Sequence, residues 1–280
     1  MSKIGVIGAG TMGQGIAQAF AAAGNQVTVC DIKIEWAQNG INKIGAKLDK
    51  LVSRGKIAED AANSIKANLT AGESDYSGLA DVDFVVEAVL EQVKVKQDLF
   101  KTLDGICKDS TIFCSNTSSL SITEIANGVK HEVIGMHFFN PADRMKLIEV
   151  IRGGATKDET VQAVKELSEQ IGKTPVEVNE APGFVVNRIL VPMINEGVFV
   201  LQEGVASAKD IDTAMKLGAN HPMGPLELGD LIGLDIVLDV MDVLYNETGD
   251  SKYRACTLLR KMVRAGKLGR KTGEGFYKYN

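Results

Sequence analysis

His137 carries the side chain best suited to exchange a proton at neutral pH. It stands in the segment Gly135–Pro141, at the end of a predicted strand and among apolar residues. An imidazole can accept the proton that an alcohol releases on oxidation, because its ordinary pKa lies close to neutral pH. A histidine in such surroundings is also commonly a structural side chain with satisfied hydrogen bonds. A partner group is needed to separate these two hypotheses.

A carboxylate suited to orient this histidine follows along the chain. Glu149 interrupts the apolar run Met145–Ile151, where an unpaired charge would be costly to bury. A hydrogen bond to His137 would satisfy Glu149 and fix the orientation of the imidazole ring. The alternative interpretation is that Glu149 points into solvent from an edge strand.

Small hydroxyl side chains follow another predicted strand, Thr111–Cys114. They form the run Ser115–Ser119, in which Ser118 can donate to or accept from a substrate oxygen. The carboxyl ends of strands in an α/β sheet face the ligand crevice, so Ser118 and His137 are both expected there. Taken alone, such a run is equally typical of an ordinary loop or helix cap.

A glycine-rich turn follows the first predicted strand. Gly8, Gly10 and Gly13 form the pattern G-x-G-x-x-G, and Thr11 and Met12 lie between the last two glycines. Gly8 permits the tight turn, Gly10 lets a pyrophosphate approach the backbone, and Gly13 allows the helix to pack closely on the strand. The helix that follows offers N–H groups and a positive dipole end to the diphosphate. The turn therefore predicts a dinucleotide site.

Asp31 ends the second predicted strand, at the position expected to bind the adenosine ribose hydroxyls. A carboxylate there favours NAD as the cofactor, because it would repel the 2′-phosphate of NADP. The alternative interpretation is an ordinary turn residue at a strand end. Lys33 is a nearby cation that is compatible with NADP.

These residues require elements that bring them to one edge of a sheet. From Lys3 to about Val178, β-branched runs alternate with helical segments, which is typical of βαβ units around a parallel sheet. The predicted strands are Lys3–Ile7, Gln26–Asp31, Asp83–Glu87, Thr111–Cys114, Glu132–Phe138, Lys146–Ile151 and Pro175–Val178. The predicted helices are Thr11–Ala23, Ile34–Arg54, Glu91–Cys107, Ile122–Gly128 and Asp158–Ile171. Ser121 and Glu124 have the spacing of a capping box at the fourth helix.

The pattern changes near Glu180–Gly183, and beyond it helical signals continue without a convincing strand. The predicted helices there are Gly183–Gly204 with an interruption at Pro192, Lys209–Leu217, Leu226–Tyr245 and Tyr253–Ala265. We therefore expect a Rossmann-type, doubly wound α/β domain that binds NAD at residues 1–181. An all-helical domain for substrate binding and dimerisation is expected at residues 182–280.

Composition excludes several classes of protein. The chain of 280 residues is 45% hydrophobic and 24% charged, as in ordinary folded proteins. Its net charge of −5 disfavours binding to nucleic acid or to an anionic membrane. The four cysteines are widely spaced and predict neither a metal site nor a disulfide framework. The apolar run Ile4–Ile7 is too short for a signal peptide or a membrane span, so a cytoplasmic location is expected.

Six segments of the chain together resemble the L-3-hydroxyacyl-CoA dehydrogenases. They occur in the order of that family and extend over essentially the whole sequence. The segments are Asn116–Ser119, Gly135–Pro141, Lys146–Val150, Pro182–Arg188, His221–Pro225 and Lys271–Tyr277. The length of the chain is similar to that of the short 3-hydroxybutyryl-CoA dehydrogenases.

The resemblance implies hydride transfer between NAD and C3 of a 3-hydroxyacyl-CoA, which is interconverted with the 3-ketoacyl-CoA. It implies that His137 and Glu149 act as an acid–base pair, and that Ser118 and Asn187 bind the substrate oxygens. On the cofactor side it implies Glu91, Lys96, Asn140 and Lys271. Without the resemblance, these four residues would be interpreted as solvated helix charges, a turn residue and a charge of the tail. Asn187 would be a polar residue on the helix that connects the domains.

The CoA end of the substrate needs an anion site of its own. Basic side chains recur at helical spacing beside an apolar stripe, so that one helix face can dock while its neighbour presents cations. The basic side chains are Lys43, Lys47, Lys50 and Arg54. The resemblance favours Lys50 and Arg54 for the nucleotide phosphates. A solvated amphipathic helix is the alternative interpretation.

The C-terminal helices carry many apolar residues over a short span. They are Leu226, Leu228, Leu231, Ile232, Leu234, Ile236, Val237 and Leu238. This apolar surface and the resemblance both favour a homodimer built on this domain, although an unusually apolar core would give the same pattern.

Two competing functions remain at this point. One is another nicotinamide dehydrogenase with a Rossmann half and a helical half, acting on hydroxy acids or sugar acids. The other is a non-catalytic NAD-binding or crystallin-like structural protein of the same fold. The presence of Ser118, His137, Glu149 and Asn187 together argues for retained chemistry.

Overall fold

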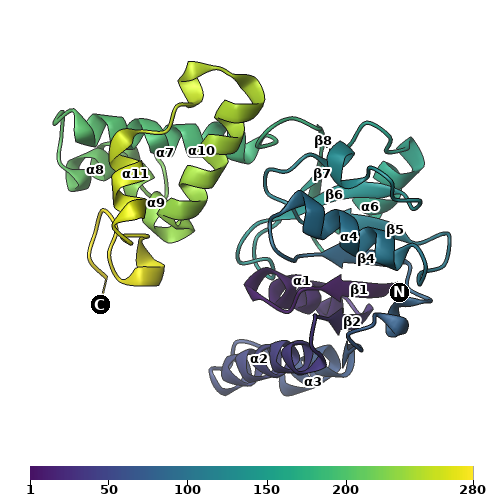
Figure 1. Ribbon diagram of the computed structural model, residues 1–280. Coiled ribbons are helices and arrows are strands. Elements are labelled where there is room, and N and C mark those ends of the chain that lie inside the picture. Colours follow the sequence, from purple (N-terminus) through teal and green to yellow (C-terminus); the bar gives the residue numbers. More distant parts are fainter. Residues whose placement is uncertain (280) are drawn as a thin grey trace. The chain divides into compact units, whose positions relative to one another are not determined.

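The computed structural model of the protein describes residues 1–279. Backbone contacts divide the chain into two compact units, the first spanning Met1–Ala181 and the second beginning at Pro182. Each unit has a hydrophobic core of its own. Figure 1 shows the first unit as a sheet covered by helices and the second as a group of helices.

The first unit is built on one sheet with the strand order β3-β2-β1-β4-β5-β6-β7-β8. The strands are β1 (Lys3–Ile7), β2 (Gln26–Cys30), β3 (Leu69–Ala71), β4 (Phe84–Glu87), β5 (Ile112–Ser115), β6 (Val133–Phe138), β7 (Leu147–Arg152) and β8 (Thr174–Asn179). All neighbouring strands pair in parallel except β6 and β7, which are antiparallel. The expected Rossmann-type class is confirmed.

Two differences from the expected sheet have physical causes. The strand β7 reverses direction because only residues 139–146 connect it to β6, and a parallel crossover needs a dozen residues or more. The strand β3 and the helix before it, α3 (Glu59–Ala67), were not expected. Since β3 has three residues and α3 buries only Ala62, neither shows an apolar period that a sequence pattern can reveal.

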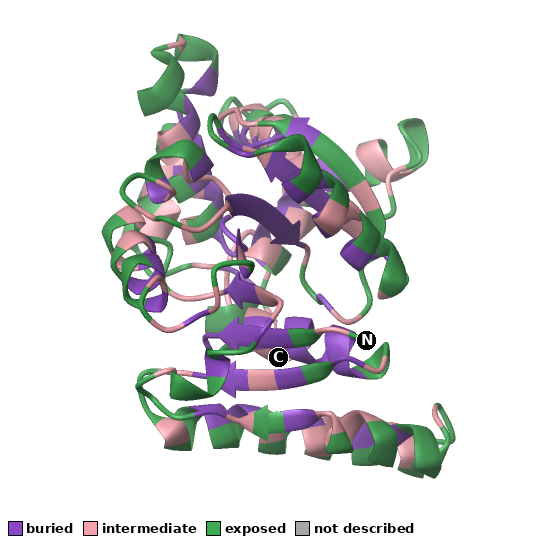
Figure 2. Ribbon diagram, turned by 90° about the vertical axis from the view of Figure 1, so that its right-hand side faces the viewer, coloured by how far each residue is buried: buried purple, intermediate pink, exposed green. Residues whose placement is uncertain are grey.

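Helices cover both faces of this sheet. They are α1 (Thr11–Ala22), α2 (Ile34–Ser53), α4 (Val93–Leu103), α5 (Ile122–Ile125), α6 (Asp158–Gln170) and the 3-10 turn η1 (Ser77–Leu79). Residues of α1, α2 and α6 join the core on one face, whereas Phe100 of α4 stacks on Phe113 of β5. The backbone N–H of Glu124 donates to Ser121 Oγ, which confirms the predicted cap of α5. Figure 2 shows buried residues concentrated along the strands.

The second unit contains α7 (Val186–Gln202), α8 (Ala208–Gly218), α9 (Pro225–Ile232), α10 (Leu234–Thr248), α11 (Thr257–Arg264) and the 3-10 turns η2 (Ser251–Tyr253) and η3 (Arg270–Thr272). The single helix expected over Leu226–Tyr245 is divided at Gly233, whose φ of 107° is incompatible with a continuous helix. The helix α7 begins after Gly183 and Phe184, which both have positive φ, and it continues through Pro192.

Several further properties hold for the part of the chain that the structure describes. No helix among residues 1–279 is both long enough and apolar enough to span a membrane. The four cysteines are buried and unbridged, and burial raises the pKa of Cys107 to about 11. No group of three or more potential metal ligands occurs within the same range.

Candidate active site

His137 and Glu149 face each other across two neighbouring strands. They are register partners in the antiparallel pair β6 and β7, so their side chains extend from the same face of the sheet. His137 Nδ1 lies 2.8 Å from Glu149 Oε2. The side chain of His137 is 5% exposed and that of Glu149 is 1% exposed. Glu149 is therefore not a solvated residue of an edge strand, and β8 pairs with β7 on its other side.

The contact fixes the orientation of the imidazole ring. A carboxylate oxygen accepts hydrogen bonds, so Nδ1 of His137 donates to Glu149 Oε2. The ring of Phe139 lies against the imidazole, with centroids 4.5 Å apart, and further limits its rotation.

Asn116 holds the strand end that carries His137. Its Oδ1 accepts a hydrogen bond of 2.8 Å from the backbone N–H of Phe138. This contact continues the pairing of β5 with β6 beyond Ser115 and Gly135. Sequence analysis placed Asn116 in a segment of the family resemblance but did not assign a role to it.

Glu91 fixes the loop that contains Ser118. Its Oε1 accepts from Thr117 Oγ1 at 2.6 Å and from the backbone N–H of Ser118 at 2.7 Å. The expected cofactor residue Glu91 thus lies beside the expected substrate residue Ser118. A purely solvated helix charge would not make these contacts.

Lys96 is a buried cation between two carboxylates. Its Nζ lies 2.6 Å from Glu87 Oε1 and 3.2 Å from Glu91 Oε2, and its side chain is 1% exposed. Glu87 also accepts from the backbone N–H of Val89 and from Ser115 Oγ, each at 2.7 Å. Sequence analysis missed Glu87, which links the ends of β4 and β5.

The three glycines of the first turn differ in what surrounds them. A Cβ added to Gly13 would lie 1.7 Å from the carbonyl oxygen of Gly8, so helix α1 can approach β1 only with glycine at this position. Gly8 has a φ of 102°, and its Cβ would lie 2.4 Å from the carbonyl oxygen of Ala88. A Cβ on Gly10 would have no atom within 4 Å. The backbone at Gly10 is therefore open to a ligand.

Asp31 reaches back to this glycine turn. Its Oδ2 accepts from the backbone N–H of Ala9 at 2.7 Å, and its Oδ1 accepts from that of Ile32 at 2.7 Å. Each carboxylate oxygen keeps a lone pair for a ribose hydroxyl. Lys33 lies over the ring of Trp36, with Nζ 5.5 Å from the centroid.

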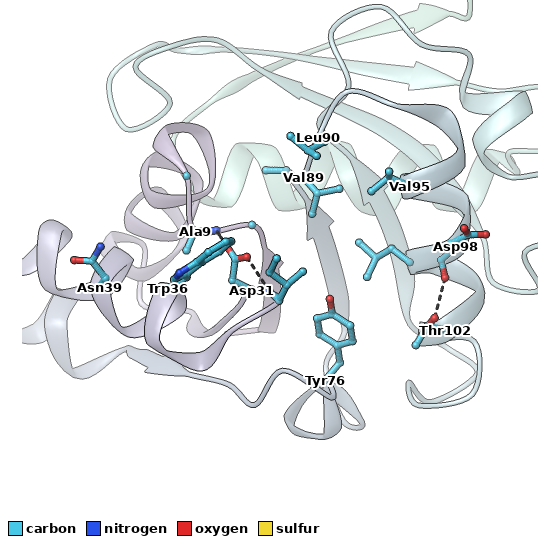
Figure 3. Close-up of a pocket in the computed structure, with 15 residues that line it drawn as sticks. Ala9, Asp31, Trp36, Asn39, Tyr76, Val89, Leu90, Val95, Asp98 and Thr102 are labelled. Atoms are coloured by element: carbon cyan, nitrogen blue, oxygen red, sulfur yellow. Dashed lines mark hydrogen bonds between the residues drawn. The ribbon is translucent and has the colours of Figure 1, made fainter.

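A cavity of about 960 Å³ opens beside the turn (Figure 3). Its volume suits a large cofactor, since small-molecule sites commonly enclose several hundred Å³. The lining residues from the turn and from the segment directly after β2 are Gly8, Ala9, Gly10, Asp31 and Ile32. The other sides are mainly apolar or aromatic and include Trp36, Tyr76, Val89, Leu90 and Val95, none of which sequence analysis identified.

The other residues of the first unit that sequence analysis proposed for ligand binding do not line the large cavity. Thr11 and Asn140 line a second, smaller cavity of about 130 Å³, whereas Met12 packs against the core. Lys50 in the last turn of α2 and Arg54 directly after the helix are exposed, as a site for phosphates requires. Lys47 belongs to the same basic stripe but pairs with Asp143 at 2.8 Å.

Two candidates lie in the second unit. Asn187 is half-buried in the first turn of α7. Lys271 Nζ lies 2.5 Å from Asp235 Oδ2, so its charge is paired within the unit.

Comparison with known proteins identifies the family of both units. The model of the 3-hydroxyacyl-CoA dehydrogenase NAD binding domain matches residues 3–181, and that of the 3-hydroxyacyl-CoA dehydrogenase C-terminal domain matches residues 183–279. The chain belongs to the 3-hydroxyacyl-CoA dehydrogenase family. It is therefore an NAD-dependent oxidoreductase, and NAD is its cofactor.

Members of this family resemble the chain over its full length. A 3-hydroxybutyryl-CoA dehydrogenase of Clostridioides difficile is 55% identical over 99% of both chains. A probable 3-hydroxybutyryl-CoA dehydrogenase of Bacillus subtilis is 50% identical over 100% of this chain and 98% of its own. The crystal structure of (S)-3-hydroxybutyryl-CoA dehydrogenase from Ralstonia eutropha has a TM-score of 0.95 and 49% identity, and covers 100% of this chain and 99% of its own.

Proposed function

We propose that the protein interconverts (S)-3-hydroxybutyryl-CoA and acetoacetyl-CoA. The names of the full-length relatives support this choice of substrate within the family. The observation that carries the chemistry is the buried 2.8 Å contact between His137 Nδ1 and Glu149 Oε2. It provides an oriented imidazole at the end of a sheet strand, where α/β folds bind their ligands.

His137 is the proposed general base and acid. In oxidation, its Nε2 accepts the proton of the 3-hydroxyl group while the hydride leaves C3 and the C3–O bond becomes a carbonyl. In reduction, the same nitrogen returns a proton to the forming alkoxide. Glu149 holds the ring and stabilises the imidazolium. Ser118 and Asn187 are the proposed ligands of the substrate oxygens.

The residues around the large cavity fit a dinucleotide. The open backbone at Gly10 and the N-terminus of α1, which has no acidic residue in its first turn, suit a diphosphate. Asp31 is the proposed ligand of the ribose hydroxyls. NAD, when bound, supplies the acceptor for the hydride. The further proposed cofactor residues are Gly8, Thr11, Met12, Gly13, Glu91, Lys96, Asn140 and Lys271.

Lys50 and Arg54 are the proposed ligands of the CoA phosphates. Both are exposed at the C-terminal end of α2, whose Ile44 and Leu48 are buried, so this end of the helix presents cations while its apolar stripe docks. Lys47 is less suited to this role because Asp143 already neutralises it.

A steady-state comparison tests the proposed activity. Acetoacetyl-CoA and longer 3-ketoacyl-CoAs are each assayed with NADH and with NADPH, and kcat/KM is expected to be highest for acetoacetyl-CoA with NADH. A higher kcat/KM for a longer chain would contradict the proposed substrate. If the protein binds NADH but never oxidises it with any of these thioesters, the crystallin-like alternative gains support.

A homodimer built on the second unit and a cytoplasmic location are parts of the same proposal. Most of the apolar residues over 226–238 are used by the core of the unit, but Leu231 and Ile236 remain 48% and 45% exposed. Analytical ultracentrifugation of the protein and of Ile236→Glu tests the dimer. A monomeric wild-type protein would contradict it.

A further inference from the structure

The loop that connects His137 to Glu149 has no regular structure of its own. It comprises residues 139–146 between β6 and β7 and is longer than the roughly two to five residues usual in hairpins. The length and conformation of the connecting loop help to set the register of a hairpin. The register matters here because it places His137 opposite Glu149. The contacts that hold the loop therefore bear on this register.

Lys173 holds this loop from within the fold. It lies between α6 and β8 and is 8% exposed. Its Nζ donates to the carbonyl oxygens of Ala142 at 2.8 Å and of Met145 at 2.7 Å. The two carbonyls lie on either side of Asp143, so one ammonium group joins both halves of the loop.

The burial of a charge at this position calls for an explanation. Burial lowers the pKa of Lys173, and the charge of Asp143 only partly opposes this shift. A methionine would fill similar volume without the cost of desolvating an ammonium group. What methionine cannot supply is the set of N–H donors that the two carbonyls accept.

Neighbouring elements hold the same loop from other sides. Lys47 of α2 pairs with Asp143, whose side chain is only 10% exposed. A Cβ on Gly15 of α1 would lie 3.1 Å from Ala142 Cβ, so glycine permits the loop to rest on the helix. The backbone N–H of Thr174 donates to the carbonyl oxygen of Lys146 at 2.7 Å. Lys173 is thus one of several anchors, and its ammonium group joins two carbonyl oxygens of the loop.

We propose that Lys173 is a positioning residue for the pair His137 and Glu149. It ties the loop so that β7 enters the sheet with Glu149 opposite His137, and it does not itself touch the reacting atoms. This inference rests on the proposed acid–base role of His137.

Lys173→Met tests the inference, because it removes the donors and keeps the volume. We expect kcat with acetoacetyl-CoA to fall about tenfold or more, with KM changed less than about threefold, since orientation of the base is lost while substrate contacts remain. Lys165→Met is the matched control, because Lys165 pairs with Glu177 of β8 at 3.3 Å outside the loop. Val164→Ala, in the core under α6, controls for lower stability. Both controls should keep kcat within about twofold.

Proton NMR supplies a readout that a general loss of stability would not produce. An imidazole N–H that donates to a carboxylate gives a strongly deshielded resonance. His131, which also pairs with a carboxylate, provides an internal reference. In Lys173→Met we expect the His137 resonance, assigned by its absence in His137→Ala, to broaden or disappear while that of His131 persists.

The outcomes separate this inference from the proposed function. Wild-type kcat and an unchanged His137 resonance in Lys173→Met would overturn it, as would an equal loss of kcat in Val164→Ala. If His137→Ala keeps its turnover, the acid–base proposal fails first and the inference with it. If Lys173→Met does not fold, Lys173→Gln keeps a polar side chain that ends one atom short of the ammonium position, so it is expected to lose at least one of the two carbonyl contacts. A kcat reduced about fivefold or more in that variant supports the inference, and a wild-type kcat contradicts it.

Discussion

At the scale of single residues, a histidine paired with a carboxylate lies near each end of β6. Near the amino end, His131 Nδ1 lies 2.6 Å from Asp104 and Nε2 lies 3.0 Å from the carbonyl oxygen of Lys108. Its ring also stacks on Phe113. Both nitrogens of His131 thus serve the structure, whereas His137 stands at the carboxyl end, where ligands bind.

This contrast provides a matched pair of variants. His137→Ala should lower turnover by about two or more orders of magnitude, as the loss of a general acid–base does. NADH binding should persist, measured as energy transfer from Trp36, the chain's single tryptophan, which lines the large cavity. His131→Gln should lower Tm and keep turnover. Near-normal turnover in His137→Ala would remove His137 from the proposed role.

Asp31 allows a prediction about the choice of cofactor. Asp31→Ala should raise the Kd for NADH about tenfold, because it removes the proposed ribose ligand and the contact with Ala9. The preference for NADH over NADPH should narrow, since the negative charge no longer repels a 2′-phosphate. Titrations that follow Trp36 fluorescence measure both affinities. Asp49→Ala, an exposed carboxylate of α2, is the control, and equal effects in the two variants would refute the assignment.

The role of a residue could be predicted where it follows from the pattern of the neighbouring residues in the sequence. The glycine turn, Asp31 and His137 stand at strand ends that short apolar runs reveal, and Glu149 was noticed as a charge in such a run. Asn116 and Lys173 were missed because their partners are distant in sequence, as in the contact between Lys173 and Ala142. Glu87 was missed because its contact with Ser115 is equally distant. Nothing in the composition of a segment indicates a contact of that kind.

At the scale of elements, the glycine turn shows how closely a helix can approach a strand. Gly13→Ala should lower Tm by more than about 5 °C, because its Cβ would overlap the carbonyl oxygen of Gly8. Gly10→Ala should leave Tm nearly unchanged and weaken NADH binding about tenfold or more, since its methyl group enters open space that a diphosphate would use. Thermal unfolding and NADH titration measure the two effects. The reverse ranking would contradict this assignment of the glycines.

Helices and strands could be predicted from the sequence where they bury a regular stripe of apolar residues. Elements without such a stripe could not be predicted. Seven strands and the main helices were expected close to their observed positions. The helix α3 was missed because it buries only Ala62. The break at Gly233 was missed because apolar residues continue on both sides of it and only the positive φ separates α9 from α10. The direction of β7 follows from the short loop that connects it to β6, and not from the residue types within the strand.

At the scale of the whole molecule, buried carboxylates tie the C-terminal tail to the second unit. Asp230 accepts from the backbone N–H groups of Phe276 and Tyr277 and from the Tyr279 hydroxyl, each at 2.9 Å. Asp212 accepts from the Tyr277 hydroxyl at 2.6 Å. The last residues of the described chain are therefore part of the folded unit and contribute to its stability.

Tyr279 makes this stability sensitive to alkaline pH. Burial, and then the hydrogen bond to Asp230, raise the pKa of Tyr279 to about 12. In the unfolded chain the phenol ionises near its ordinary value, about 10. The stability that Tyr279 contributes is thus complete below about pH 10 and is lost as the pH rises toward about 12. Urea unfolding over this range should show a smaller loss for Tyr279→Phe than for the wild type, and equal losses would contradict the prediction.

The antiparallel direction of β7 has a consequence for how the proposed acid–base pair can be exchanged between related genes. Because β6 and β7 form a hairpin, the proposed acid–base pair and its connecting loop occupy one continuous stretch, residues 137–149. Gene shuffling between relatives can transplant this stretch as a single cassette, with both partners already matched to each other. The glycine turn, Asp31 and Ser118 lie in separate stretches and would have to be recombined one by one. Chimeras that exchange only this hairpin are therefore expected to retain the imidazole–carboxylate contact.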